Sequence, residues 1–341
     1  LGEELPEGAM LVFNNTKVIR ARIIMHKPSG ARIEVFCLEP HAPADYERAF
    51  AVKGKCAWSC IVGNLKKWKE GALVIDFTLD GTPQQLRAYR TGTGGREQIV
   101  RFEWEADLTF GELLELLGRI PIPPYLNRDS QQIDYTRYQT VYSKFEGSVA
   151  APTAGLHFTP ELMAALEAKG AKFAAVELEV GIDTFRLVEE DDPTQHVMHT
   201  ERYHVSQEVV DAVHKAKAEG HRVIAVGTTA VRSLESAFDA DAPVSDPAVT
   251  ARYFEGREDG ADTLGRGDIV VRENATTQLY LMPGSTYHVV DALITNFHVP
   301  RSTLMMLVSA LASRDQIMDA YAAAIEERYR FFSFGDAMLI C

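Results

Sequence analysis

The sequence predicts an α/β domain that is interrupted by a smaller, mostly antiparallel β domain. Between residues 23 and 109, short runs of alternating apolar and polar residues are separated by Gly, Pro and Asp, which is typical of a small barrel or sandwich. On both sides of this segment, amphipathic helical patterns alternate with apolar runs of the buried-strand type. We therefore assign residues 1–22 and 110–341 to one discontinuous α/β domain and residues 23–109 to the inserted domain.

Length and composition indicate a soluble protein of a reducing compartment. The 341 residues are enough for two domains with a large core, and 46% of them are hydrophobic. We expect no membrane span, because no apolar run reaches the roughly 18 to 20 residues that a bilayer requires. Four cysteines are too few for a disulfide scaffold of this size and favour a cytoplasmic location.

The stretch from residue 134 to residue 159 combines signals that a plain core segment does not combine. Three tyrosines recur at helical spacing in DYTRYQTVY, so residues 134–142 are predicted to form a short helix. Pro152 excludes a helix further along, because it lacks a backbone donor and restricts the residue before it. We expect a strand over residues 148–151, followed by a tight Pro-Thr-Ala-Gly loop.

His157 follows this loop and directly precedes a predicted helix start. Thr159 is a suitable N-cap and Pro160 a suitable first helical residue, while Gly155 permits a sharp turn. Two interpretations of His157 remain open. It is either a loop anchor bonded to the backbone, or a group for proton transfer or substrate binding.

Polar residues also interrupt the apolar pattern at three later places, namely 228–232, 296–298 and 335–336. The strand-like HRVIAVG runs into Thr228 and Thr229 and then into a predicted helix. Unsatisfied N–H groups at a helix start favour an anion such as a carboxylate or a phosphate. Since ligands of α/β folds bind at the ends of buried strands, these breaks are candidate site positions.

Seven blocks of the sequence, spread over nearly the whole chain, share one resemblance. They are LVFNNTKVIRARI (11–23), GRIPIPPYLNRD (118–129), YQTVYSKFEGSVAAPTAGLHFT (138–159), MHTERYHV (198–205), VIAVGTTAVRSLES (223–236), DALITNFHVPRSTLMMLVSA (291–310) and YRFFSFGDAMLI (329–340). Together they resemble the S-adenosylmethionine:tRNA ribosyltransferase-isomerases of queuosine biosynthesis.

The resemblance implies that a β-barrel is inserted into the α/β domain and that the protein is a monomeric cytoplasmic enzyme. It implies transfer and isomerisation of the ribosyl moiety of S-adenosylmethionine onto the 7-aminomethyl-7-deazaguanine base of a tRNA anticodon, with release of adenine and methionine. S-adenosylmethionine is then a substrate, and no cofactor, metal or membrane is required. The reaction needs acid and base groups with shifted pKa values.

Candidate residues for this reaction come from the polar breaks, and we expect them to meet in a cleft between the two domains. The catalytic candidates are His157, His298, His199, Glu201 and Asp336. The substrate-binding candidates are Tyr138, Gln139, Thr140, Thr153, Gly155, Gly227, Thr228, Thr229, Arg232 and Asn296. Asp183 is a further ionisable candidate, although the family more often has glycine there, and the spacing of His196, His199 and His204 does not favour a metal site.

A net charge of −13 opposes binding to a polyanion such as tRNA unless basic residues cluster locally. Lys66 and Lys67 in GNLKKWKEG, together with Arg128 and Arg137, are the candidates for contact with tRNA. Each of these groups can equally be a solvated face.

Two other classes of function remain in view. A conventional methyltransferase would also use S-adenosylmethionine, but the sequence has no glycine-rich loop after a first strand with a following acidic residue for the ribose hydroxyls. A noncatalytic RNA-binding module would need a basic surface and would not require histidines at loop ends.

Overall fold

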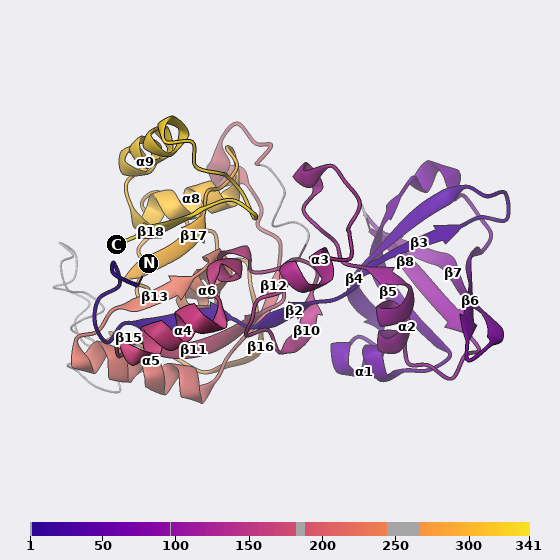
Figure 1. The fold of residues 1–341 in the computed structure, drawn as a ribbon, viewed down its shortest axis with the longest axis horizontal. Helices are drawn as coiled ribbons and strands as arrows, with labels where there is room; N and C mark the ends of the chain where they lie inside the picture. The colour runs from indigo at the N-terminus through magenta and orange to yellow at the C-terminus, as the bar shows by residue number, and fades with distance from the viewer. Residues whose placement is uncertain (1, 96, 182–187, 244–265) are drawn as a thin grey trace. The chain divides into compact units, whose positions relative to one another are not determined.

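The computed structural model describes residues 2–95, 97–181, 188–243 and 266–341 (Figure 1). The chain divides into two compact units. Unit 1 consists of residues 1–17 and 137–341, and unit 2 of residues 18–136.

Unit 1 is built on a seven-stranded sheet with the order β16-β12-β11-β1-β13-β17-β18. Strands β1, β11, β13 and β17 are parallel, whereas β12, β16 and β18 join the sheet through antiparallel pairs. The strands of this sheet are β1 (Met10–Asn14), β11 (Lys172–Leu178), β12 (Glu201–Val205), β13 (Val223–Val226), β16 (Arg272–Thr277), β17 (Ala292–Asn296) and β18 (Ala337–Ile340). Two smaller pairs are β2 (Thr16–Val18) with β10 (Phe145–Ser148), and β14 (Phe238–Pro243) with β15 (Arg266–Ile269).

Helices cover both faces of this sheet. Since successive residues of each strand point to opposite faces, each strand contributes side chains to two cores. Met10 and Val12 of β1 belong to a core that includes residues of α5 (Gln207–Glu219), α6 (Thr228–Ala237), α8 (Thr303–Leu311) and α9 (Arg314–Glu326). Leu11 and Phe13 belong to a second core with Phe158 and with residues of α4 (Pro160–Ala168). Figure 1 shows α8 and α9 beside the β17 and β18 end of the sheet. The predicted α/β arrangement is confirmed.

The carboxyl ends of the four parallel strands lie at the same edge of the sheet. A buried polar network closes part of this edge after β1. The Asn14 amide donates to the Leu178 carbonyl at 2.9 Å and accepts from the Leu178 N–H at 3.1 Å. The Thr16 and Ser148 hydroxyls complete the network. The polar residues of NNT thus join β1 to β11.

Unit 2 is a closed six-stranded antiparallel barrel. The order is β4-β5-β8-β7-β6-β3, and pairing of β3 with β4 closes the ring. Its elements are β3 (Arg22–His26), β4 (Arg32–Ala42), α1 (Tyr46–Ala51), β5 (Lys55–Gly63), the 3₁₀ turn η1 (Leu65–Lys67), β6 (Leu73–Leu79), β7 (Thr82–Gly94), β8 (Glu97–Trp104), α2 (Phe110–Leu117), β9 (Gly118–Arg119) and the 3₁₀ turn η2 (Pro124–Leu126). The resemblance implied a barrel in this part of the chain, and a barrel is what the structure has.

The two units do not begin and end at the residues predicted for the two domains, and aromatic packing near residue 110 explains the difference there. Residues 18–22 and 110–136, assigned from the sequence to the α/β domain, group with the barrel. Phe110 at the start of α2 packs against Trp58 and Trp104, with ring centroids 5.5 and 5.7 Å apart. Trp58, Trp68 and Trp104 are all buried core residues.

Local signals were confirmed at some element ends and were wrong at others. The Thr159 hydroxyl caps α4 and Pro160 is its first residue, as predicted. The helix predicted over residues 134–142 is only the single turn α3 (Asp134–Arg137), and Tyr138 after it is fully buried. The strand predicted over residues 148–151 is instead β10, which ends at Ser148.

Within the described parts of the chain, no helix combines the length and the apolar character that crossing a membrane requires.

Candidate active site at the carboxyl edge of the parallel strands

A chain of side-chain hydrogen bonds joins the loop before α4 to the end of β17. Thr153 and His157 are the two ends of the 3₁₀ turn η3 (Thr153–His157). The Thr153 hydroxyl donates to Asn296 Oδ1 at 3.0 Å, and Asn296 Nδ2 donates to His157 Nε2 at 3.0 Å. Because Nε2 accepts here, the neutral His157 ring carries its proton on Nδ1.

Three influences set the protonation of His157. Burial lowers its pKa, the Asp336 carboxylate raises it and the Arg330 guanidinium lowers it again. The net shift is downward from an ordinary value of about 6.5. His157 is therefore a neutral imidazole at pH 7, which is the form that a proton-transfer group needs if it is to accept a proton.

The start of α6 lies next to η3 and has no side-chain cap. Gly227 has φ 91° and ψ 153°, a conformation that essentially only glycine adopts. A Cβ on Gly227 would lie 3.5 Å from the Ala154 Cβ, so the two loops are in contact. The Thr229 hydroxyl is buried and has no hydrogen-bond partner among the described residues. The uncapped N–H groups of the first turn of α6 favour an anionic ligand.

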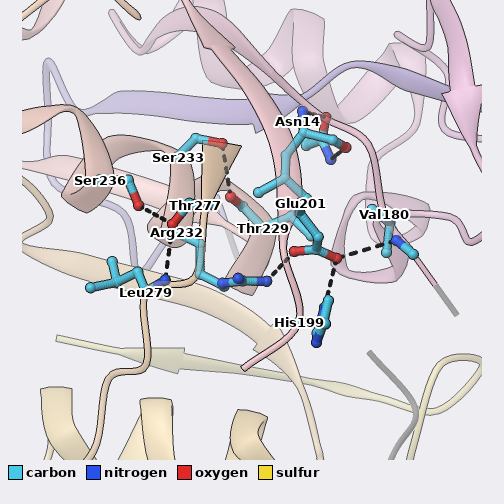
Figure 2. Close-up of polar contacts among 12 residues, drawn as sticks. Asn14, Val180, His199, Glu201, Thr229, Arg232, Ser233, Ser236, Thr277 and Leu279 are labelled. Carbon is cyan, nitrogen blue, oxygen red and sulfur yellow. Dashed lines mark hydrogen bonds and ion pairs between the residues drawn. The ribbon is translucent and has the colours of Figure 1, made fainter. Parts of the chain in front are cut away.

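Arg232, one turn further along α6, forms a buried ion pair with Glu201 at the start of β12 (Figure 2). The two residues are only 5% and 3% exposed. The Arg232 Nη1 donates to one Glu201 oxygen. The other oxygen accepts from the Gly181 N–H at 3.2 Å and lies 3.1 Å from His199 Nε2.

The opposite edge of the Arg232 guanidinium is left open. Nε and Nη2 are buried, and neither has a hydrogen-bond partner in the described part of the chain. These two nitrogens form the edge that binds a carboxylate through two parallel N–H donors. Since Thr229 and Arg232 are three residues apart in one helix, they share a helix face.

Glu201 is held in its ionised form. Burial raises its pKa, but the charge of Arg232, the contact with His199 and the Gly181 N–H lower it by more. The net pKa of Glu201 is therefore below its ordinary value. A carboxylate in this state orients Arg232 and is a weak base.

His298 and Asp336 are engaged in contacts of their own. Burial lowers the pKa of His298 to about 4, and its Nε2 lies 2.9 Å from the Thr295 hydroxyl. The Asp336 carboxylate accepts from the Arg330 backbone N–H at 2.7 Å and from its Nη2 at 2.8 Å. The bond to Arg330 lowers the pKa of Asp336. These contacts favour supporting roles for both residues.

The segment after α3 packs against η3 at Gly155. A Cβ on Gly155 would overlap the Tyr142 hydroxyl and would lie 2.8 Å from the Thr140 methyl group, so only glycine fits there. Burial raises the pKa of Tyr142. Tyr142 was not among the predicted site residues, although its position in YQTVY, close before the loop, was a usable signal.

The structure thus brings together most of the candidates that lie in unit 1. They come from residues 138–142, 153–157, 199–201, 227–232 and 296. Among the tRNA-contact candidates, Arg128 makes two hydrogen bonds to the buried Asp134 carboxylate, at 2.6 and 2.9 Å. Asp183 lies outside the described residues. No group of three His, Cys, Asp or Glu side chains with the geometry of a metal site is present in the described ranges.

A neutral histidine, an uncapped helix start and a buried arginine with two unbonded nitrogens lie at one sheet edge of this α/β protein and form a candidate site for a small anionic ligand. The sequence matches the family described as "Queuosine biosynthesis protein" over residues 1–340. The chain belongs to this family.

Two relatives agree with this assignment. The chain is 40% identical over 340 residues to the S-adenosylmethionine:tRNA ribosyltransferase-isomerase of Trichlorobacter lovleyi, covering 99% of this chain and 86% of the relative. It is 41% identical over 343 residues to the protein of the same name from Desulfitobacterium hafniense, covering 99% and 87%. A solved structure of S-adenosylmethionine tRNA ribosyltransferase from Thermotoga maritima is 32% identical, with a TM-score of 0.42, and is matched over 100% of this chain and 85% of that one.

Proposed function

We propose that this protein is an S-adenosylmethionine:tRNA ribosyltransferase-isomerase. It transfers and isomerises the ribosyl moiety of S-adenosylmethionine onto the 7-aminomethyl-7-deazaguanine base of tRNA. The product is epoxyqueuosine-tRNA, and adenine and methionine are released. Family membership and the names of the relatives support the activity. The observation that carries it is the contact, at Ala154 and Gly227, between the turn that bears His157 and the open start of α6.

The open edge of Arg232 and the start of α6 suit the methionine carboxylate of S-adenosylmethionine. Nε and Nη2 of Arg232 supply two parallel donors, and the Thr229 hydroxyl supplies a third. The partial positive charge of the helix start adds to the attraction for a carboxylate. Glu201 holds Arg232 in place, so this site is prepared before the ligand arrives.

His157 is the proton-transfer group in this proposal. The reaction requires removal of a C5′ proton made acidic by the sulfonium, and a proton for the departing adenine. His157 is neutral, its Nδ1 bears the proton, and its basic nitrogen Nε2 accepts from Asn296 Nδ2. Proton transfer to Nε2 therefore requires that the bound substrate displaces this hydrogen bond. In the free protein, Asn296 fixes the His157 tautomer. S-adenosylmethionine is consumed as a substrate, and its sulfonium supplies the activation.

The decisive experiment incubates the protein with S-adenosylmethionine and substrate tRNA and measures free adenine and methionine. A methyltransferase would release S-adenosylhomocysteine instead, and an RNA-binding module would release nothing.

His157→Ala then tests the site. We expect the single-turnover rate to fall by at least about 10²-fold, the contribution of a general acid or base. The melting temperature and tRNA affinity should stay near those of the wild type. His41→Ala, which removes an exposed histidine of β4, is the matched control and should turn over normally. A folded His157→Ala protein with the wild-type rate would return His157 to the role of a loop anchor.

A further inference from the structure

A rigid, basic turn connects β5 to β6 in unit 2. Asn64 adopts a left-handed conformation with φ 58°, and the Lys67 N–H donates to its carbonyl at 2.8 Å. Trp68 is 1% exposed, and its indole N–H donates to the Gly71 carbonyl at 2.9 Å. Because Trp68 is anchored inside, the lysines on either side of it are held on the surface.

Two cations from other strands join this turn. Lys27, which follows β3, donates its ammonium to the Lys67 carbonyl at 3.2 Å. Arg90 of β7 donates from Nη2 to the Lys69 carbonyl at 2.9 Å. We call the resulting set, Lys27, Lys66, Lys67, Lys69 and Arg90, the basic turn surface.

The basic turn surface is not neutralised by the residues around it. Across the part of the chain that the structure describes, none of its five cations forms an ion pair with an acidic side chain, and Glu70 is the one acidic residue in the segment 64–71. Elsewhere in the barrel, Arg22, Lys53 and Arg101 each have a carboxylate partner. Five like charges gathered at one turn repel each other, in a chain whose net charge is −13.

We propose that the basic turn surface binds the phosphate backbone of the tRNA substrate. This inference rests on the proposed function and names the part of the chain that receives the nucleic acid. Lysines supply point charges to phosphates and release counterions, which gives affinity without sequence specificity. The rigid turn reduces the side-chain and loop ordering that binding otherwise costs. The lysine run of GNLKKWKEG, Lys66, Lys67 and Lys69, was a candidate from the sequence, and the fold adds Lys27 and Arg90 from elsewhere in the barrel.

The test compares two triple variants with the same change of net charge. Lys66→Gln, Lys67→Gln and Lys69→Gln together alter the basic turn surface. Lys55→Gln, Lys172→Gln and Lys215→Gln together remove three exposed lysines from other elements and serve as the control. Binding of substrate tRNA is measured by fluorescence anisotropy over a series of salt concentrations.

We expect the first triple variant to bind tRNA about 50- to 150-fold more weakly at about 0.15 M salt, as three phosphate contacts with slopes of about 0.7 to 0.9 each imply. The slope of its salt dependence should fall by about one unit for each lysine that no longer neutralises a phosphate. Its KM for tRNA should rise, while its KM for S-adenosylmethionine and its rate at saturating tRNA stay unchanged. The control variant should bind like the wild type.

Unchanged tRNA affinity in the first variant, or an equal loss in both variants, would overturn the inference. The proposed function fails separately, if the wild-type protein binds tRNA but releases no adenine. In that case the binding measurements still decide whether the basic turn surface contacts RNA.

Discussion

Replacement of Arg232 by methionine separates the two roles that the structure gives to this residue. The variant removes the guanidinium from the Glu201 carboxylate, which is 3% exposed, while the Gly181 N–H and His199 stay close to it. Removing one partner of a buried ion pair costs about 3 to 5 kcal/mol of the free energy of unfolding. Domains are stable by only about 5 to 15 kcal/mol, so we expect a large loss. The double variant Arg232→Met/Glu201→Met removes both charges, and its stability should return close to that of the wild type.

Binding of S-adenosylmethionine should follow a different pattern in the same variants. Hydrogen bonds to charged groups contribute about 1.5 to 3 kcal/mol, so loss of the arginine should weaken binding about 10- to 150-fold. The double variant cannot recover this loss, because it still lacks the donors. Urea unfolding followed by circular dichroism measures stability, and calorimetric titration measures affinity. If the double variant regains affinity together with stability, Arg232 does not bind the substrate.

The pH dependence of the stability lost in Arg232→Met gives an independent check on Glu201. Its pKa is lowered in the folded protein, so its stabilisation is present above the pKa of the unfolded chain and is lost as pH falls through the folded pKa. The wild type should therefore lose stability on acidification below about pH 4.5. In Arg232→Met, burial without a cation raises the pKa of Glu201, so the difference from the wild type should shrink as pH falls. A difference that is independent of pH between 3 and about 7 would contradict the assigned ion pair.

Two further substitutions test the loops around His157. Asn296→Asp should raise the pKa of His157, because a carboxylate accepts from the protonated ring. The acid limb of the single-turnover pH profile should then move to higher pH. An unmoved limb would argue against proton transfer by His157. Gly227→Ala forces a side chain into φ 91° and ψ 153° and should cost about 1 to 3 kcal/mol of the free energy of unfolding in urea. Gly30→Ala, also at positive φ but with open space around the Cβ position, is the control for strain alone.

Local signals in the sequence predicted the ends of helices and strands where one residue acts on its neighbours. Thr159 and Pro160 defined the start of α4, and the apolar run before Gly227 defined β13 and the helix after it. The alternation between residues 23 and 109 identified an antiparallel β domain, although the residues alone did not distinguish a barrel from a sandwich. Closure depends on the pairing of β3 with β4, which periodicity does not report.

Contacts between distant residues decided what the sequence left open. Asn296 reaches His157 across 139 residues, and Arg232 reaches Glu201 across 31. No spacing rule connects such pairs, so the sequence predicted Asn296 as a ligand contact without its hydrogen bond to His157. The domain boundary near residue 110 was placed by a change of pattern, whereas the packing of Phe110 on Trp58 assigns α2 to the barrel.

The same sheet edge contains two kinds of polar cluster, and the way their hydrogen bonds are satisfied distinguishes their roles. Asn14, Thr16 and Ser148 bond to each other and to the backbone of residue 178, which accounts for them as structure. Thr229 and the outer edge of Arg232 are equally buried but have no acceptor among the residues that the structure describes. Each unsatisfied buried donor costs about 1 to 3 kcal/mol, more when charged. A ligand carboxylate that accepts from these donors offsets that cost on binding. We therefore locate the substrate at Thr229 and Arg232, whose donors are unsatisfied, and not at the cluster of Asn14, Thr16 and Ser148.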